Sequence, residues 1–151
     1  MAATKMLAPE VFEGIEIKDP DATEDTWEQF GGITDLQKAV DSEEEDVADF
    51  DSDGHGEDLT TQRTVSYEVE AFALIDPDTG EHARGQEIIL EAAEKVGYAS
   101  RVTCRVLKAG NRFEEFTANI DLGNQGGGVT GVSTLGMTLT ATGWPTKGTE
   151  S

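Results

Sequence analysis

Three aspartates, Asp49, Asp51 and Asp53, alternate along an acidic segment and precede Gly54, as in the first half of a calcium-binding loop. Carboxylates at odd positions before a glycine turn can surround a hard cation with oxygen ligands. The pattern fails at its twelfth position, where Thr60 replaces the bidentate glutamate that such a loop needs. We therefore expect a solvated acidic loop that becomes ordered against a partner, without a fixed metal or cofactor.

The other reactive side chains form no catalytic pattern. His55 and His82 lie in predicted loops, without a nucleophile at motif spacing and without a zinc-like cluster. Cys104 is the one cysteine; it stands in a predicted strand, where we expect it in the core. The glycine run Gly126–Gly128 precedes a strand and lacks the Lys-Ser/Thr pair of a phosphate loop. The sequence therefore predicts a protein that is not an enzyme.

Charge is the strongest compositional signal. The 151 residues include 31 acidic and 11 basic side chains, which gives a formal net charge of −20. Binding to phosphates or anionic lipids needs lysine and arginine, so the composition disfavours a sequence-reading DNA-binding protein. It still allows a repulsive wall past which DNA slides. Acids are also frequent outside residues 41–58, which suits a halophilic host, with an acidic mesophilic protein as the equal alternative.

Length and hydropathy predict one domain without a membrane partner. No apolar run approaches the ~18 residues that a bilayer span requires. The first residues, Met1–Ala8, lack the apolar centre of a signal peptide. We therefore expect a protein that acts in the cytoplasm where it is made, or that leaves inside a particle.

Two segments have clear periodicity. Residues 61–75 alternate between apolar and polar side chains, as in a half-buried antiparallel strand that ends at the turn residues Asp76–Gly80. Residues 86–96 then switch to the helical period, and Gly97 is expected to end the helix. A helix of this length is not stable alone in water, so it must pack on a sheet.

Further alternating strands are expected at Val102–Val106, Phe116–Leu122 and Leu135–Ala141, with a hairpin turn at Gly110-Asn111 and a flexible connection at Gly123–Gly128. This series predicts a mainly β fold, an antiparallel β-sandwich or barrel with one packed α-helix.

The predicted domain spans residues 26–146, with a short strand pair or turn around Gly31-Gly32 and an acidic loop over 41–60. We expect an extended N-terminal arm at 1–25 and a C-terminal tail at 147–151. The predicted core residues are Trp27, Val65, Tyr67, Val69, Ile89, Val96, Val102, Phe116, Ile120 and Leu139.

The order of these signals resembles the major tail tube proteins of tailed viruses, especially those with long non-contractile, siphovirus-like tails. Gly32–Leu36 and Glu43–Ser52 resemble the family's first strand and following loop, although Ala48 and Asp49 depart from the usual threonine-containing form. Other stretches resemble the central strand, the flanking helix and the closing strands: Arg63–Ala73, Gly85–Gly97, Phe116–Ile120 and Gly131–Gly143. The resemblance covers most of residues 26–146.

This resemblance implies a structural subunit that forms hexameric rings, which stack into a hollow tube conducting DNA without sequence-specific binding. It implies a tape-measure protein, a tail terminator and distal tail or baseplate proteins as partners, and a place in the virion tail after assembly in the host cytoplasm. A lumen lined by acids would repel DNA phosphates. The implied contact with the neighbouring ring lies in the acidic loop, at Glu43, Glu44, Glu45, Asp46, Asp49, Phe50 and Asp51.

Two alternatives stay open. A tube protein of a contractile tail or of a type VI secretion apparatus shares the same architecture. An acidic calcium-binding β-module is suggested by Asp49, Asp51 and Asp53, and calcium-dependent thermal stability of the monomer would distinguish it.

Overall fold

The protein is an antiparallel β structure with one α-helix in the part of the chain that the structure describes. The computed structural model describes residues 3–7, 11–21, 23–47, 56, 58–129 and 131–149. The elements in chain order are β1 (Phe12–Lys18), β2 (Trp27–Phe30), β3 (Ile33–Asp46), β4 (Asp58–Phe72), α2 (Arg84–Ala93), the 3-10 helix η2 (Gly97–Ser100), β5 (Arg101–Lys108), β6 (Arg112–Gly126), β7 (Thr134–Ala141) and β8 (Thr146–Thr149). The predicted fold class is confirmed.

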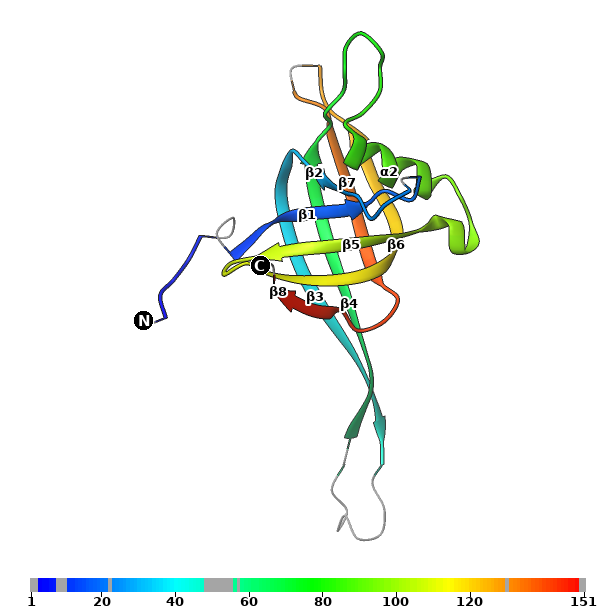
Figure 1. Ribbon diagram of the computed structural model, residues 1–151. Coiled ribbons are helices and arrows are strands. Elements are labelled where there is room, and N and C mark those ends of the chain that lie inside the picture. The colour runs from blue at the N-terminus through cyan, green and yellow to red at the C-terminus, as the bar shows by residue number, and fades with distance from the viewer. Residues whose placement is uncertain are drawn as a thin grey trace.

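One continuous sheet makes both layers of the fold. Its strand order is β2-β1-β5-β6-β7-β4-β3, and β8 pairs with β6. Strand β6 joins the layers, because residues 112–119 pair with β5 whereas residues 118–126 pair with β7. In Figure 1, β1 and β5 cross over β4 and β7, so the sheet folds back on itself around a core. Helix α2 lies at one end of this sandwich (Figure 1).

The core lies between the two layers and follows the alternation predicted from the sequence. In β4, Val65, Tyr67 and Val69 are buried, and burying such an apolar side chain contributes about 1.5–3 kcal/mol. Ile120 is partly buried and packs against the core. Cys104 is fully buried, and burial raises the pKa of its thiol. The other predicted core residues found buried are Ile89, Val102, Phe116 and Leu139.

Two predicted core residues lie outside the core. Val96 is 90% exposed, because α2 ends at Ala93 and the chain is already extended at Val96. Gly97, at φ 72°, begins the 3-10 helix that leads into β5 and does not itself end α2. Trp27 is half-buried and pairs with Lys18, which places it on the face of β2 opposite to the core.

Both predicted terminal extensions are shorter than expected. Strand β1 belongs to the sheet, between β2 and β5, and its Ile15 and Ile17 are fully buried. These two isoleucines alternate with polar residues, but two positions are too few for the period to stand out among acids. At the other end, Thr146–Thr149 form β8 against β6, so the predicted tail at 147–151 is paired as far as Thr149.

Three predicted connections also differ. Residues 41–46 and 58–60, expected in a loop, continue β3 and β4. The expected flexible segment at Gly123–Gly128 continues β6 as far as Gly126, with a register shift before Gln125. The strands on either side of Gly31-Gly32 pair with other strands and not with each other. The strands around Gly31-Gly32 pair with segments that are not adjacent to each other, which local turn residues do not reveal. The other two segments lack the apolar alternation that marks a strand.

Candidate assembly surfaces

The longest hairpin ends in an exposed acidic extension, here called the acidic hairpin and defined as residues 41–46 of β3 and 58–63 of β4. The strands stay paired as far as Asp46 opposite Asp58, and every residue of this extension is exposed. Figure 1 shows the acidic hairpin leaving the body of the protein. A two-stranded ribbon without a packed face is only marginally stable in water. The acidic hairpin therefore adds little to the stability of this chain, and its exposed strands are available to contact another molecule.

Charge on the acidic hairpin is mostly negative, and Arg63, opposite Ser42, is its single basic residue. Glu43, Glu44, Glu45 and Asp46 are consecutive, and consecutive strand residues point to opposite faces, so both faces of the ribbon are acidic. Like charges on paired residues repel each other. A contact made by this surface therefore needs basic groups or screening salt. The predicted contact residues Asp49, Phe50 and Asp51, and Asp53 of the calcium-like pattern, lie outside the described residues.

A second surface, the acidic face, is the outer side of β6, β7, β4 and β3. Strand register places its residues in rows across the four strands; one row runs Asp121, Thr138, Glu68 and Gln37. The four carboxylates of this face have no basic side chain among them. The acidic face consists of Asn119, Asp121, Gly136, Thr138, Thr140, Ser66, Glu68, Glu70, Asp35, Gln37 and Ala39.

Both lateral edges of these four strands are open in the described chain. Strand β3 is the last strand of the sheet order. On the other side, the pairing of β6 with β5 stops at Asn119, so residues 120–122 and 125–126 have a β7 partner but no β5 partner. Unpaired strand edges present rows of free backbone groups that can add another strand. The two edges can therefore pair with each other between different copies.

Helix α2 is attached to this sheet by Gln86, a fully buried polar side chain that sequence reasoning missed. Its amide oxygen accepts a hydrogen bond from Leu74 N–H at 3.0 Å. Its amide nitrogen donates to the carbonyls of Gly31 at 3.1 Å and Phe72 at 2.8 Å. One side chain thus joins the start of the helix to the ends of β2 and β4. The only local signal is a glutamine within the apolar stripe of a helix.

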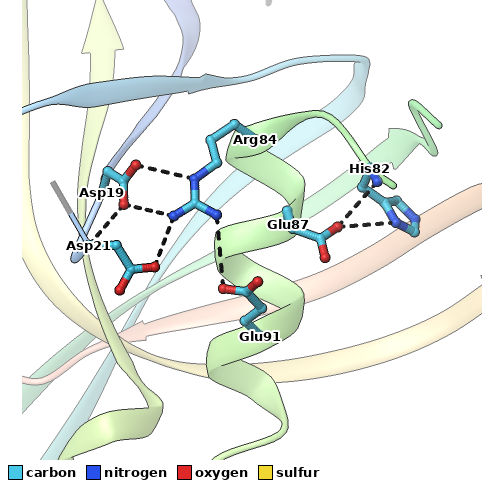
Figure 2. A network of polar contacts seen from close by, with 6 residues as sticks. All are labelled: Asp19, Asp21, His82, Arg84, Glu87 and Glu91. Carbon is cyan, nitrogen blue, oxygen red and sulfur yellow. Dashed lines mark hydrogen bonds and ion pairs between the residues drawn. The ribbon is translucent and has the colours of Figure 1, made fainter. Parts of the chain in front are cut away.

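The start of α2 also carries a polar network (Figure 2). The Arg84 guanidinium donates to Asp19 at 2.8 and 3.2 Å and to Asp21 at 3.2 Å. Its hydrogen bonds hold the pKa of the Asp19 carboxyl below its usual range. On the other side of the helix, the His82 backbone N–H donates to Glu87 at 3.2 Å. The network holds the β1–β2 turn and the segment before α2 against the helix, and His82 has a positioning role there.

A buried ion cluster around Glu114 of β6 joins the two layers. Glu114 is 2% exposed, and Lys38 Nζ lies 3.0 Å from each of its carboxylate oxygens. Lys108 Nζ donates to Oε1 at 3.0 Å, and the Tyr67 hydroxyl donates to Oε2. Burial alone would raise the pKa of this carboxyl, but its three donors outweigh burial and lower the pKa to about 2. Glu114 therefore remains charged at neutral pH.

Neither a metal cluster nor a membrane-spanning helix is found in the described chain. Within those residues, no three His, Cys, Asp or Glu side chains gather closely enough to hold a metal ion. No helix there has the length and apolar character needed to cross a membrane. The calcium pattern at Asp49, Asp51 and Asp53 stays a prediction, since those residues are not described.

Comparison with known proteins relates the fold to viral tails. The sequence matches no protein-family model and no curated protein. The tail tube of SPP1 matches 97% of this chain and 80% of its own, with a TM-score of 0.72 and 16% identity. A subunit from the tail of an empty gene transfer agent particle, refined with C6 symmetry, matches 97% of this chain and 100% of its own, with a TM-score of 0.60 and 18% identity.

A chain from the virion of the native gene transfer agent matches 95% of this chain and 99% of its own, with a TM-score of 0.61 and 17% identity. These similar proteins are components of tails and virions. At such low identity the likeness establishes a shared fold, and it extends over nearly the whole chain.

Proposed function

We propose that this protein is the structural subunit of a viral tail tube, in which rings of copies stack into a hollow conduit for DNA. The observation that carries the proposal is the pair of open edges on β3 and on residues 120–126 of β6. Joining these edges between neighbouring copies satisfies their backbone groups and closes a ring. Such a head-to-tail contact is heterologous, as ring formation requires.

Strand direction supports this closure. The four strands β6, β7, β4 and β3 alternate in direction, and an even number of strands lets the alternation continue into the next copy. The similar gene transfer agent tail has C6 symmetry, so we propose six copies in each ring. Twenty-four strands at about 4.8 Å spacing and typical barrel tilt give a backbone diameter of about 40–50 Å. A conduit of this size is wider than a DNA duplex.

In this arrangement the acidic face lines the lumen. Its carboxylates, among them Glu68, Glu70 and Asp121, repel the phosphates of DNA. No lysine or arginine stands among these carboxylates, and Arg101, which donates to Asn119 at 3.2 Å, lies at the margin of the face. The face therefore attracts phosphates weakly. DNA would therefore pass without adhering to the wall and without its sequence being read.

The acidic hairpin then contacts a neighbouring ring. It extends beyond the sandwich and is exposed along its whole described length. We place the subunit in the tail of a siphovirus-like virion assembled in the host cytoplasm, with a tape-measure protein, a tail terminator and distal tail proteins as partners. A halophilic host would supply the salt that screens the acidic surfaces.

Negative-stain electron microscopy of the purified protein tests this function. We expect hollow rings or tubes, and if the host is halophilic they form only at multimolar salt. Dispersed monomers at both low and multimolar salt, at concentrations up to the solubility limit, would contradict a self-assembling tube subunit.

The lumen assignment is tested by labelling: a bulky label on a cysteine replacing Thr138 should face the interior of the tube.

A further inference from the structure

Four of the eleven basic side chains of this acidic protein gather at one end of the sandwich. We call them the basic cluster: Lys38, Lys108, Arg112 and Lys147. Strand register places them together, because Lys108 pairs with Arg112 and Glu114 pairs with Lys147. Lys38 and Lys108 share the carboxylate of Glu114, and Arg112 and Lys147 line the same hollow as that carboxylate. The cluster therefore has more positive than negative charge on a chain whose net charge is −20.

Two members of the cluster have no acidic partner in the described chain. Lys38 and Lys108 are ion-paired with Glu114, whereas Arg112 and Lys147 are exposed and make no ion pair with any described residue. The surface around them is hollowed, with Val11, Ala109 and Phe113 contributing apolar lining. In a chain with almost three acids for each base, unpaired bases around a hollow indicate a site for an anionic partner.

We propose that the basic cluster receives the acidic hairpin of a neighbouring copy. This inference rests on the proposed tube function and names the surface onto which the hairpin docks. Both faces of the acidic hairpin carry carboxylates, so whichever face meets the cluster brings negative charge to it. The hollow gives room for an exposed apolar residue of the hairpin, such as Leu59 at 58% exposure.

Charge also favours this occupant over DNA. The basic cluster is small, and the negative net charge of the chain repels a phosphate backbone that extends beyond the cluster. The acidic hairpin is a short, concentrated run of carboxylates at the end of a ribbon that reaches out from the body. Its carboxylates are confined to a few residues, as are the four bases of the cluster, whereas the charges of a nucleic acid continue along the whole polymer.

Paired charge reversals test the docking. Lys147→Glu places an acid in the cluster. Lys95→Glu is the matched control, since Lys95 is an exposed lysine two residues after the end of α2 that makes no ion pair with a described residue. At about 0.15 M salt or the lowest salt that supports tubes, we expect Lys147→Glu to raise the concentration needed for assembly about tenfold. Lys95→Glu should leave it unchanged. Circular dichroism melting of both variants verifies that they are folded.

Rescue identifies the occupant. Adding Glu44→Lys to Lys147→Glu restores opposite charges across the contact, so the double variant should assemble at a lower concentration than either single variant. Cysteines replacing Glu44 and Lys147 should form disulfide-linked chains of subunits on oxidation, and Cys104, being fully buried, does not compete. Cysteines replacing Glu44 and Lys95 should form none.

Each failure has its own meaning. If the wild-type protein forms no rings or tubes, the proposed function and this inference both fail. If the wild type assembles and Lys147→Glu behaves like Lys95→Glu, the docking site is wrong while the tube function stands. Binding of a short DNA duplex that Lys147→Glu abolishes, with assembly unchanged, would assign the basic cluster to nucleic acid and overturn the proposal.

Discussion

Strand β4 passes through two very different regions of the protein. Over residues 64–72 it lies in the sandwich, with buried side chains alternating with the acidic face. Over residues 58–63 the same strand keeps its pairing with β3, yet every side chain is exposed. Both regions are paired with β3, but only the sandwich half is covered by other elements, and a register shift between Glu43 and Glu44 interrupts the pairing in the hairpin half. The buried side chains of the sandwich stabilise the monomer, whereas the acidic hairpin adds none to the core and is the part of β4 that we propose for contacts between copies.

The largest expected effect is that of a charge placed in the sandwich half of β4. Val69→Asp buries an unpaired carboxylate among apolar side chains, which should cost more than about 4 kcal/mol and leave the chain unfolded. The matched control in the acidic hairpin is Gln62→Asp, which should change the free energy of unfolding by less than about 1 kcal/mol. Thermal unfolding followed by circular dichroism compares them. A soluble, cooperatively folding Val69→Asp protein would show that the core face is assigned incorrectly.

Removing the attachment of α2 comes next. Gln86→Leu leaves the Leu74 N–H and the carbonyls of Gly31 and Phe72 without their partner, at a cost of about 3–5 kcal/mol. Gln37→Leu, a change of the same chemistry on the exposed acidic face, should cost under about 0.5 kcal/mol. Urea denaturation measures both. Equal stability of the two variants would mean that Gln86 does not hold the helix.

The buried carboxylate gives a pH-dependent effect. The folded-state pKa of Glu114 is depressed to about 2, below the usual value of 4.5, so its contribution is fully present above pH 4.5 and is lost as the pH falls toward 2. Glu114→Gln should therefore lower stability at pH 7 and flatten the acid limb of the stability curve. An unchanged acid limb in urea denaturation between pH 5 and 2.5 would refute this role.

The smallest effect on monomer stability belongs to the acidic hairpin. Replacing Glu43, Glu44 and Glu45 by glutamine should alter the free energy of unfolding by no more than about 0.5 kcal/mol, since the three side chains are exposed. Assembly should nevertheless change, because neutral side chains remove both the repulsion among the hairpin carboxylates and their salt-dependent attraction to bases of a neighbouring copy. Tube length distributions at several salt concentrations provide the measurement. Tube length distributions identical to those of the wild type would mean that the acidic hairpin takes no part in the contact between copies.

The same contrast explains what the sequence could predict. Strands with one buried face, such as the segments around Tyr67 and Leu139, carry the period of two and were predictable from it. Glu43–Asp46 has two exposed faces and therefore no alternation, so its strand character was invisible and a loop was expected. Val96 was misplaced because helical periodicity extends past the residue where the backbone leaves the helix.

The surfaces were harder to predict than the fold. Lys38 and Glu114 lie 76 positions apart, and only the pairing of the layers brings their charges together. Gln86 forms hydrogen bonds with Leu74, 12 positions away, and with Gly31, 55 positions away. The acidic hairpin was recognisable as an acidic run, since charge density is a local property of sequence. Its length and its receiving surface depend on strand register, which single-sequence patterns do not determine.

The acidic face has an electrochemical consequence. In the proposed ring, the four fixed carboxylates that each copy contributes would make the bore an ion exchanger that concentrates cations and excludes small anions. An empty tube of this kind is filled with the same mobile counterions that accompany DNA. DNA that enters the bore would bring its own counterions, so its phosphates would stay neutralised by cations inside the tube as they are outside it. The bore would then conduct sodium or potassium in preference to chloride, even with no DNA inside.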